Sequence, residues 1–351
     1  MALESSARYA SIFVRTHRER LAAEIAGRVT AHFGGDAVCG TPASEKSVRD
    51  VGYHLMYLAE ALWAGDPALL VNYVTWAKVL FAGLHFDDQV LPVTLSLTQT
   101  VLQEQLPSEL IETTADYLMV ALAHADTADG AEPTYLDPEA PHTMLAHTYL
   151  KLLLHGERQR ASQLILNAVA NGVSIKEIYL HVFQRTQQEI GRLWQMNEVT
   201  VAQEHYCTAA TQLIMSQLYP NIFNTERVGK RLVATSVGGE LHEIGIRMVT
   251  DFFELEGWDT YYLGANMPAA GVADAVTAHA ADVLAISVTL TPHMGKAVEM
   301  IEVVRRQQRS TRIMVGGYPF NIAHNLWREV GADGYAADAA AAVALGNQLT
   351  G

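Results

Sequence analysis

The sequence predicts a multi-domain chain in which two all-α segments precede an α/β domain built on a doubly wound parallel sheet. Apolar residues recur three and four positions apart in two long stretches, and a stretch at 123–142 that is rich in Ala, Asp and Pro separates them. After Val228 short β-rich runs alternate with helical stretches. We therefore expect an all-helical N-terminal domain over 1–130, a four-helix bundle over 141–222 and a sheet domain over 228–351.

The first segment has a helical period throughout, with no pattern typical of a strand. It is also rich in aromatic side chains between residues 51 and 88, enough to line a flat pocket, although aromatic residues of helical domains are more often core. The side chains in question are those of His54, Tyr57, Trp63, Tyr73, Trp76, His85 and Phe86.

The second segment divides into four helices at breaks around Gly156, residues 171–174 and residues 197–198. Ser174 and Glu177 have the spacing of a capping box, which marks a helix start. Short joins between neighbouring helices favour an antiparallel four-helix bundle. Pro220 is expected to end the last helix.

Three short apolar runs predict parallel strands in the third segment: 231–237, 283–289 and 312–317. Each is followed by a helical stretch, so the connections are expected to be right-handed crossovers. Ligands of such sheets bind at the carboxyl ends of the strands, near the topological switch point. Residues that follow these strands are therefore the candidate site.

The turn after the first run contains Glu240, His242 and Gly245. A carboxylate two residues before a histidine can hydrogen-bond one imidazole nitrogen and leave the other free for a metal. An ordinary loop histidine near a helix start would show the same short pattern. Taken alone, the motif therefore does not decide between the two.

Two later motifs extend this pattern, because Ser287 and Thr289 close the second run and Gly316–Gly317 closes the third. Together they resemble the cobalamin-binding domain, with its DxHxxG, SxL or SxT, and GG motifs. The resemblance implies that His242 is the lower axial ligand of cobalt and that the nucleotide tail threads beside Ser287 and the glycine pair. It also implies cofactor contacts from Leu241, Glu243 and Gly245, with Glu240 in place of the usual aspartate.

Ahead of the sheet domain stand Trp194 and, ten residues later, Glu204–His205. A core tryptophan and a surface pair would be the ordinary interpretation. The spacing resembles cobalamin-dependent photoreceptors of the CarH/LitR type, in which the bundle caps the upper face of adenosylcobalamin. The resemblance implies cap contacts from Trp194, Glu204 and His205, with Val201 on the same helix face as Glu204. Gln195 stands where that family has a histidine, so no histidine is expected there as upper ligand after illumination.

The function implied is a light sensor, in which photolysis of the cobalt–carbon bond drives a rearrangement of domains or oligomer. A helical domain ahead of the cap resembles photocobilins, which implies a globin-like fold and a biliverdin chromophore. The candidate bilin pocket comprises His54, Tyr57, Tyr73, Trp76 and His85, and haem ligation by His54 or His85 is an alternative.

Two other functions fit the same cobalamin motifs. One is a corrinoid methyl carrier of a methyltransferase system, and the other is a cobalamin-sensing regulator without photochemistry. In each case the chain itself is expected not to be an enzyme, since no hydrolase or kinase motif occurs.

The charge balance excludes some classes of partner. The formal net charge of −14 repels phosphate backbones and anionic membranes, so neither nucleic acid nor a membrane is expected as partner. The family's usual MerR-like DNA-binding domain is also missing ahead of the bundle. We expect a cytoplasmic homodimer with a signalling partner that the sequence does not identify.

Overall fold

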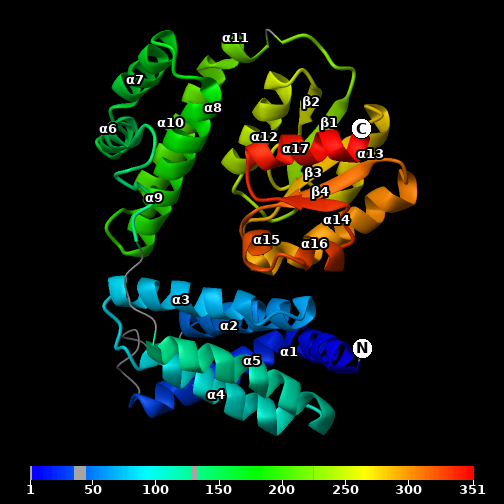
Figure 1. Ribbon diagram of the computed structural model, residues 1–351. Helices are drawn as coiled ribbons and strands as arrows, with labels where there is room; N and C mark the ends of the chain where they lie inside the picture. Colours follow the sequence, from blue (N-terminus) through cyan, green and yellow to red (C-terminus); the bar gives the residue numbers. More distant parts are fainter. Residues whose placement is uncertain (1, 35–44, 128–132, 224) are drawn as a thin grey trace. The chain divides into compact units, whose positions relative to one another are not determined.

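The computed structural model describes residues 2–34, 45–127, 133–223 and 225–351, which form two compact units, 1–132 and 133–351. Each unit is described by itself. The first is helical and the second combines helices with a parallel sheet (Figure 1). No helix within the described ranges has both the length and the apolar character that crossing a bilayer requires.

The first unit is a helical domain, as predicted, and a globin-like arrangement stays a prediction. Helix α2 shows why: Val51, Leu55, Leu58 and Leu62 follow the helical period and are all buried. Helix α1 packs against α2, α4 and α5. The bounds are α1 (Ala2–His32), α2 (Glu45–Ala64), α3 (Ala68–Gly83), α4 (Val90–Gln105) and α5 (Ser108–Thr127).

The helical part of the second unit has its breaks where the sequence predicts them. Gly156, Gly172 and Asn197 all adopt positive φ between helices. The capping box of Ser174 and Glu177 is present, and Thr200 forms a second one. The helices are α6 (Thr143–Leu154), α7 (Arg158–Ala170), α8 (Ile175–Glu177) continuing through the π-helical η1 (Ile178–Phe183) into α9 (Gln184–Gln195), then α10 (Val201–Gln217) and α11 (Tyr219–Ile222).

Two local expectations need correction. Pro220 does not end a helix but stands in the first turn of α11, where the missing N–H of proline has no helical partner to lose. Residues 133–142, expected as part of a linker, pack on the helices: Leu136 is buried, and the Tyr135 N–H donates to Glu189 Oε2 (2.9 Å). The remaining linker positions, 128–132, lie outside the described residues.

The sheet is parallel, with the strand order β2-β1-β3-β4-β5. Helices α12 and α17 pack on each other and on its strands, while α13 packs on α14 and β1. The predicted runs are β1 (Arg231–Ser236), β3 (Val283–Ser287) and β4 (Arg312–Gly316). Elements without a sequence prediction are β2 (Asp259–Tyr262), β5 (Gly334–Ala336), η2 (Thr291–His293), α13 (Ala269–Ala278), α15 (Tyr318–Ile322), α16 (Leu326–Glu329) and α17 (Ala339–Thr350); α12 (Ile244–Leu255) and α14 (Met294–Gln307) follow the predicted helical stretches.

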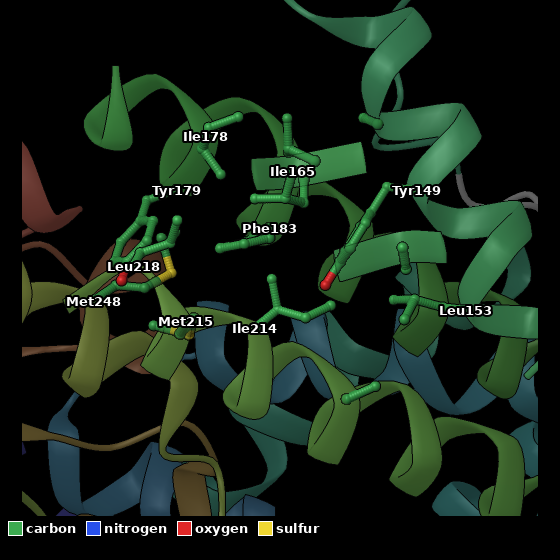
Figure 2. Packing of buried hydrophobic residues seen from close by; sticks show 14 of the residues in the cluster. Tyr149, Leu153, Ile165, Ile178, Tyr179, Phe183, Ile214, Met215, Leu218 and Met248 are labelled. Atoms are coloured by element: carbon green, nitrogen blue, oxygen red, sulfur yellow. The ribbon is translucent and has the colours of Figure 1, made fainter. Parts of the chain in front are cut away.

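One apolar core joins the helical part to the sheet part. Met248 and Phe252 of α12 belong to the same buried cluster as Tyr179, Phe183 and the α10 side chains (Figure 2). Figure 2 shows Met248 beside Met215 and Leu218. Separating the two parts would expose this apolar surface to water, which is unfavourable.

A buried polar contact lies where the helical part packs against the sheet part. The Tyr179 hydroxyl donates to Asp251 Oδ2 (2.7 Å), and both side chains are buried. Burial raises the pKa of Asp251 to about 6, and the Tyr179 hydrogen bond opposes that shift. The Asp251 carboxylate therefore depends on this donor when it is ionised.

Tyr179→Phe should lower the free energy of unfolding by about 1–3 kcal/mol at pH 8, because it removes one of the two tyrosine hydroxyl donors of the buried carboxylate, the other being Tyr219. The raised pKa of Asp251 means that the carboxyl is neutral well below pH 6, so the loss should shrink at pH 5. Urea unfolding at both pH values, with the exposed Tyr9→Phe as control, measures it. An equal loss at both pH values would contradict this account.

The carboxyl end of β4 requires glycine at position 317. Gly317 has φ +106° and ψ 177°, a region that only glycine adopts readily. A Cβ there would stand 1.9 Å from the carbonyl oxygen of Val288. The backbone conformation and the close approach of Val288 therefore both demand glycine at this position.

Gly317→Ala should therefore destabilise the fold by more than about 2 kcal/mol, through both strain and the clash with Val288. The matched control is Gly295→Ala in the first turn of α14, where a Cβ meets nothing within 4 Å. That change should be neutral or stabilise by up to about 1 kcal/mol. Thermal or urea unfolding of the two variants decides the matter, and similar midpoints would show the reasoning to be wrong.

Candidate functional site

The three sequence motifs meet at one edge of the sheet. In the strand register Ser236 pairs with Ser287, and Ser287 pairs with Gly316. The strands β1, β3 and β4 are neighbours, so their carboxyl ends lie side by side. Strand order reverses between β1 and β3, which is the switch point where sheets of this kind bind ligands.

The loop after β1 is held in place by Asn266. Its Oδ1 accepts from the Gly239 N–H (2.7 Å), and its own N–H donates to the carbonyl oxygen of Glu240 (3.0 Å). Gly239 has φ +84°, which turns the chain sharply. The turn directs the Glu240 side chain into the protein, where it is completely buried.

The Glu240 carboxylate is surrounded by N–H groups. Its Oε1 accepts from the backbone N–H (3.2 Å) and Nδ1 (2.5 Å) of His242. Its Oε2 accepts from the N–H groups of Thr289 and Leu290, both at 2.9 Å. Burial alone would raise the pKa of Glu240, but hydrogen bonds from His242, His293 and Leu290 hold it well below its usual range.

His242 presents its other ring nitrogen to the outside. Its side chain is 58% exposed, although Nδ1 is engaged by Glu240. The hydrogen bond to Glu240 raises the pKa of His242. With Nδ1–H donated to the carboxylate, Nε2 carries the lone pair and is free to bind a metal. A single donor nitrogen suits a metal whose other positions are filled by its own macrocycle.

The loop that carries His242 is open on the side of Leu241 and Gly245. Leu241 is 73% exposed beside it. A Cβ built on Gly245 meets no atom within 4 Å. At Gly316, in contrast, a Cβ would stand 3.0 Å from the carbonyl oxygen of Ala336, so the strand end is close-packed.

Glu243, also expected to contact a cofactor, accepts hydrogen bonds from two neighbouring elements. Its Oε1 accepts from Gln212 Nε2 of α10 (2.7 Å), and its Oε2 accepts from the Tyr262 hydroxyl of β2 (2.8 Å). This side chain therefore helps to fix α10 against the sheet beside His242.

Of the expected cap residues, the structure places Glu204 near His242. Glu204 is close enough for its charge to raise the pKa of His242, after the larger effect of Glu240. His205 Nδ1 pairs with Glu204 Oε2 at 2.7 Å. Val201 is exposed in the first turn of α10, Trp194 is half-buried at the end of α9, and Gln195 is buried. The structure thus brings Glu204 to the same side of the sheet as His242.

The aromatic residues of the first unit pack on one another. The rings of Tyr57 and Tyr73 stack at 3.7 Å, and the Tyr73 hydroxyl is 2.8 Å from Nδ1 of His54. Trp76 lies beside Tyr73, with the ring centroids 6.1 Å apart. His85 is the exception: it is exposed, with φ +58°, in the turn that follows α3. Burial lowers the pKa of His54 to about 4, so it is neutral.

Two residues of the site have no counterpart in the sequence prediction. His293 places Nδ1 3.2 Å from Glu240 Oε2, and Asn266 fixes the loop after β1. Neither belongs to a short motif, because each is brought to the site by an element that the tertiary structure positions. The histidine three residues after Leu290 is the only signal that the sequence offers.

Family models match the second unit. Residues 230–344 match the B12 binding domain, and residues 145–219 match a second model that is also described as a B12 binding domain. A corrinoid protein of Desulfitobacterium hafniense is 26% identical over 207 residues, which cover 57% of this chain and 94% of that protein. Dimethylamine corrinoid protein 2 of Methanosarcina acetivorans is 27% identical over 145 residues, 40% of this chain and 65% of that protein.

The fold has a solved counterpart. The monomethylamine corrinoid protein of Methanosarcina barkeri superposes with a TM-score of 0.53 at 20% identity, over 59% of this chain and 99% of that one. At this identity the likeness shows the fold alone. The two matched models and the corrinoid relatives support cobalamin binding by the second unit, and its fold, a helical region followed by a parallel α/β domain, is like that of corrinoid proteins.

Proposed function

We propose that this chain is a corrinoid carrier that holds cobalamin through His242 and presents a methyl group to the enzymes of a methyltransferase system. The observation that carries the proposal is the exposed His242 imidazole, backed by the buried Glu240 at the switch point of the sheet. The corrinoid proteins among its relatives support the carrier function better than the photoreceptor function.

Four residues of the chain have separate roles in holding the cofactor. Nε2 of His242 would bind the cobalt of the corrinoid, and Glu240 orients the ring through Nδ1. The N–H groups of Thr289 and Leu290 hold the carboxylate at the end of β3. When bound, the corrinoid supplies a cobalt that accepts and releases an alkyl group. The chain itself carries this group and is not a catalyst.

A second candidate is the light sensor that binds adenosylcobalamin. It is favoured by the Glu204–His205 pair, which stands over the His242 side of the sheet. The comparisons do not support it, since the relatives reported are corrinoid proteins rather than photoreceptors. The core shared by α10 and α12 also opposes the separation of bundle and sheet that photolysis would have to drive. Biliverdin binding in the first unit belongs to this candidate, as does a signalling partner.

One experiment separates the two candidates. The protein is loaded in the dark with methylcobalamin or adenosylcobalamin, and absorbance and elution volume are recorded before and after green light. A carrier should bind methylcobalamin, keep its elution volume in light, and in the dark pass its methyl group to a thiol acceptor when a corrinoid methyltransferase is added. Photolysis of bound adenosylcobalamin with a shift in elution volume, without methyl transfer, would replace the carrier by the sensor.

His242→Ala should remove the nitrogen ligand from the bound cobalt. In the cob(II)alamin-loaded protein, the electron paramagnetic resonance spectrum should lose the splitting that an axial nitrogen causes, and affinity for cobalamin should fall at least about 10-fold. His155→Ala is the control, because His155 is exposed and bonds only within α6 and its cap. An unchanged spectrum in His242→Ala would rule out this lower ligand.

Glu240→Gln should weaken cobalamin binding roughly 10- to 100-fold, the range typical of residues that orient a metal ligand. A glutamine amide presents an NH2 group where the carboxylate accepts only, so either His242 or the pair of backbone N–H groups meets a donor. Equilibrium titration with hydroxocobalamin measures the affinity. The exposed Glu299→Gln, paired only with Lys296, should bind as the unaltered protein does.

A further inference from the structure

A second histidine, His293, shares the Glu240 carboxylate with His242. We propose that His293 is a positioning residue for the cobalt ligand: it fixes the Glu240 carboxylate and limits how strongly that carboxylate polarises His242. The inference rests on the proposed function, because it takes His242 to be the lower ligand. It assigns a role to a residue outside the three motifs.

The geometry shows that His293 donates to Glu240. Its Nδ1 lies 3.2 Å from Oε2, the same oxygen that accepts from the N–H groups of Thr289 and Leu290. Backbone N–H groups can only donate, so this oxygen is an acceptor and the proton of the third bond belongs to His293. The ring is therefore held with hydrogen on Nδ1.

The carboxylate has no acceptor capacity left. Oε1 receives two N–H groups of His242, and Oε2 receives those of Thr289, Leu290 and His293. A carboxylate offers about four lone-pair positions, so five donors saturate it. Rotation of the Glu240 carboxylate would break several of these bonds at once inside the protein.

His293 is itself fixed by its position. It ends η2 and directly precedes α14, whose first residue Met294 is buried. Its side chain is 22% exposed. Its Nε2 would be 3.4 Å from a Cβ built on Gly239, so the ring lies against the loop that carries Glu240 and His242.

Loss of the His293 donor should change electron donation by Nε2 of His242 in one direction. Each donor draws electron density from the carboxylate, so the donors compete. Without the N–H of His293, Glu240 would accept more strongly from Nδ1 of His242, which makes Nε2 a better electron donor. A stronger axial donor favours the more oxidised cobalt.

The test compares two variants of the cobalamin-loaded protein. His293→Leu removes the donor, and His293→Asn keeps an N–H near the place of Nδ1. We expect the midpoint potential of the cob(II)/cob(I)alamin couple to shift to more negative values in His293→Leu, with a changed axial-nitrogen splitting in the cob(II) spectrum. Both should return toward the unaltered protein in His293→Asn. No shift in His293→Leu, or a positive one, overturns the proposal.

Two further measurements keep the outcomes apart. If His242→Ala keeps the nitrogen splitting, the proposed lower ligand fails; if it loses the splitting while His293→Leu matches the unaltered protein, only the present inference fails. The second measurement is nuclear magnetic resonance of 15N-histidine in the unaltered, cobalamin-free protein, so it does not depend on whether any variant folds. We expect the His293 ring with a protonated, hydrogen-bonded Nδ1, and an unprotonated Nδ1 would overturn the proposal.

Discussion

The site depends on one buried charge. A carboxylate without exposure to water is strongly unfavourable unless hydrogen bonds replace its hydration. Glu240 obtains these bonds from three parts of the chain: its own loop, the end of β3 and the start of α14. Since the parts must be in place together to satisfy the carboxylate, the site forms only when the strand ends are assembled. The same arrangement leaves one nitrogen of His242 directed outward.

The second constraint is the joint between α10 and the sheet. Gln212 of α10 donates to Glu243 beside His242, and Arg247 of α12 donates to the Gln212 carbonyl oxygen (3.1 Å) and to the Ser216 hydroxyl (2.7 Å). Together with the shared apolar core, these bonds hold α10, which carries Glu204, against the sheet part. The position of Glu204 near His242 is therefore determined by packing elsewhere along α10.

The sequence predicts those parts of the fold that carry a periodic signal. Strands β1, β3 and β4 are runs of buried apolar residues, and the motif residues follow directly from their ends. Strand β2 reads Asp-Thr-Tyr-Tyr and is only half-buried at a sheet edge, and β5 has three residues, so neither has a recognisable pattern. Their strand conformation depends on pairing with a neighbour, β1 for β2 and β4 for β5.

The predicted site succeeds and fails for the same reason. The pairing of Glu240 with His242 is local, two residues apart, and the sequence spacing predicts it. His293 reaches the same carboxylate across more than fifty positions, and such a contact has no local signal. His85 has aromatic neighbours in sequence, but it lies in an exposed turn after α3, and the short sequence pattern does not indicate this.

The length of the Glu240 side chain sets the spacing between two loops. The Glu240 side chain reaches from the turn after β1 to the N–H groups that follow β3. The side chain of aspartate is shorter by one methylene group. A chain with aspartate at this position must bring those loops closer or leave one set of N–H groups to another acceptor. Glutamate and aspartate are thus not interchangeable here, although both are acids: each belongs to its own loop separation, and exchanging one for the other requires the ends of two strands to move.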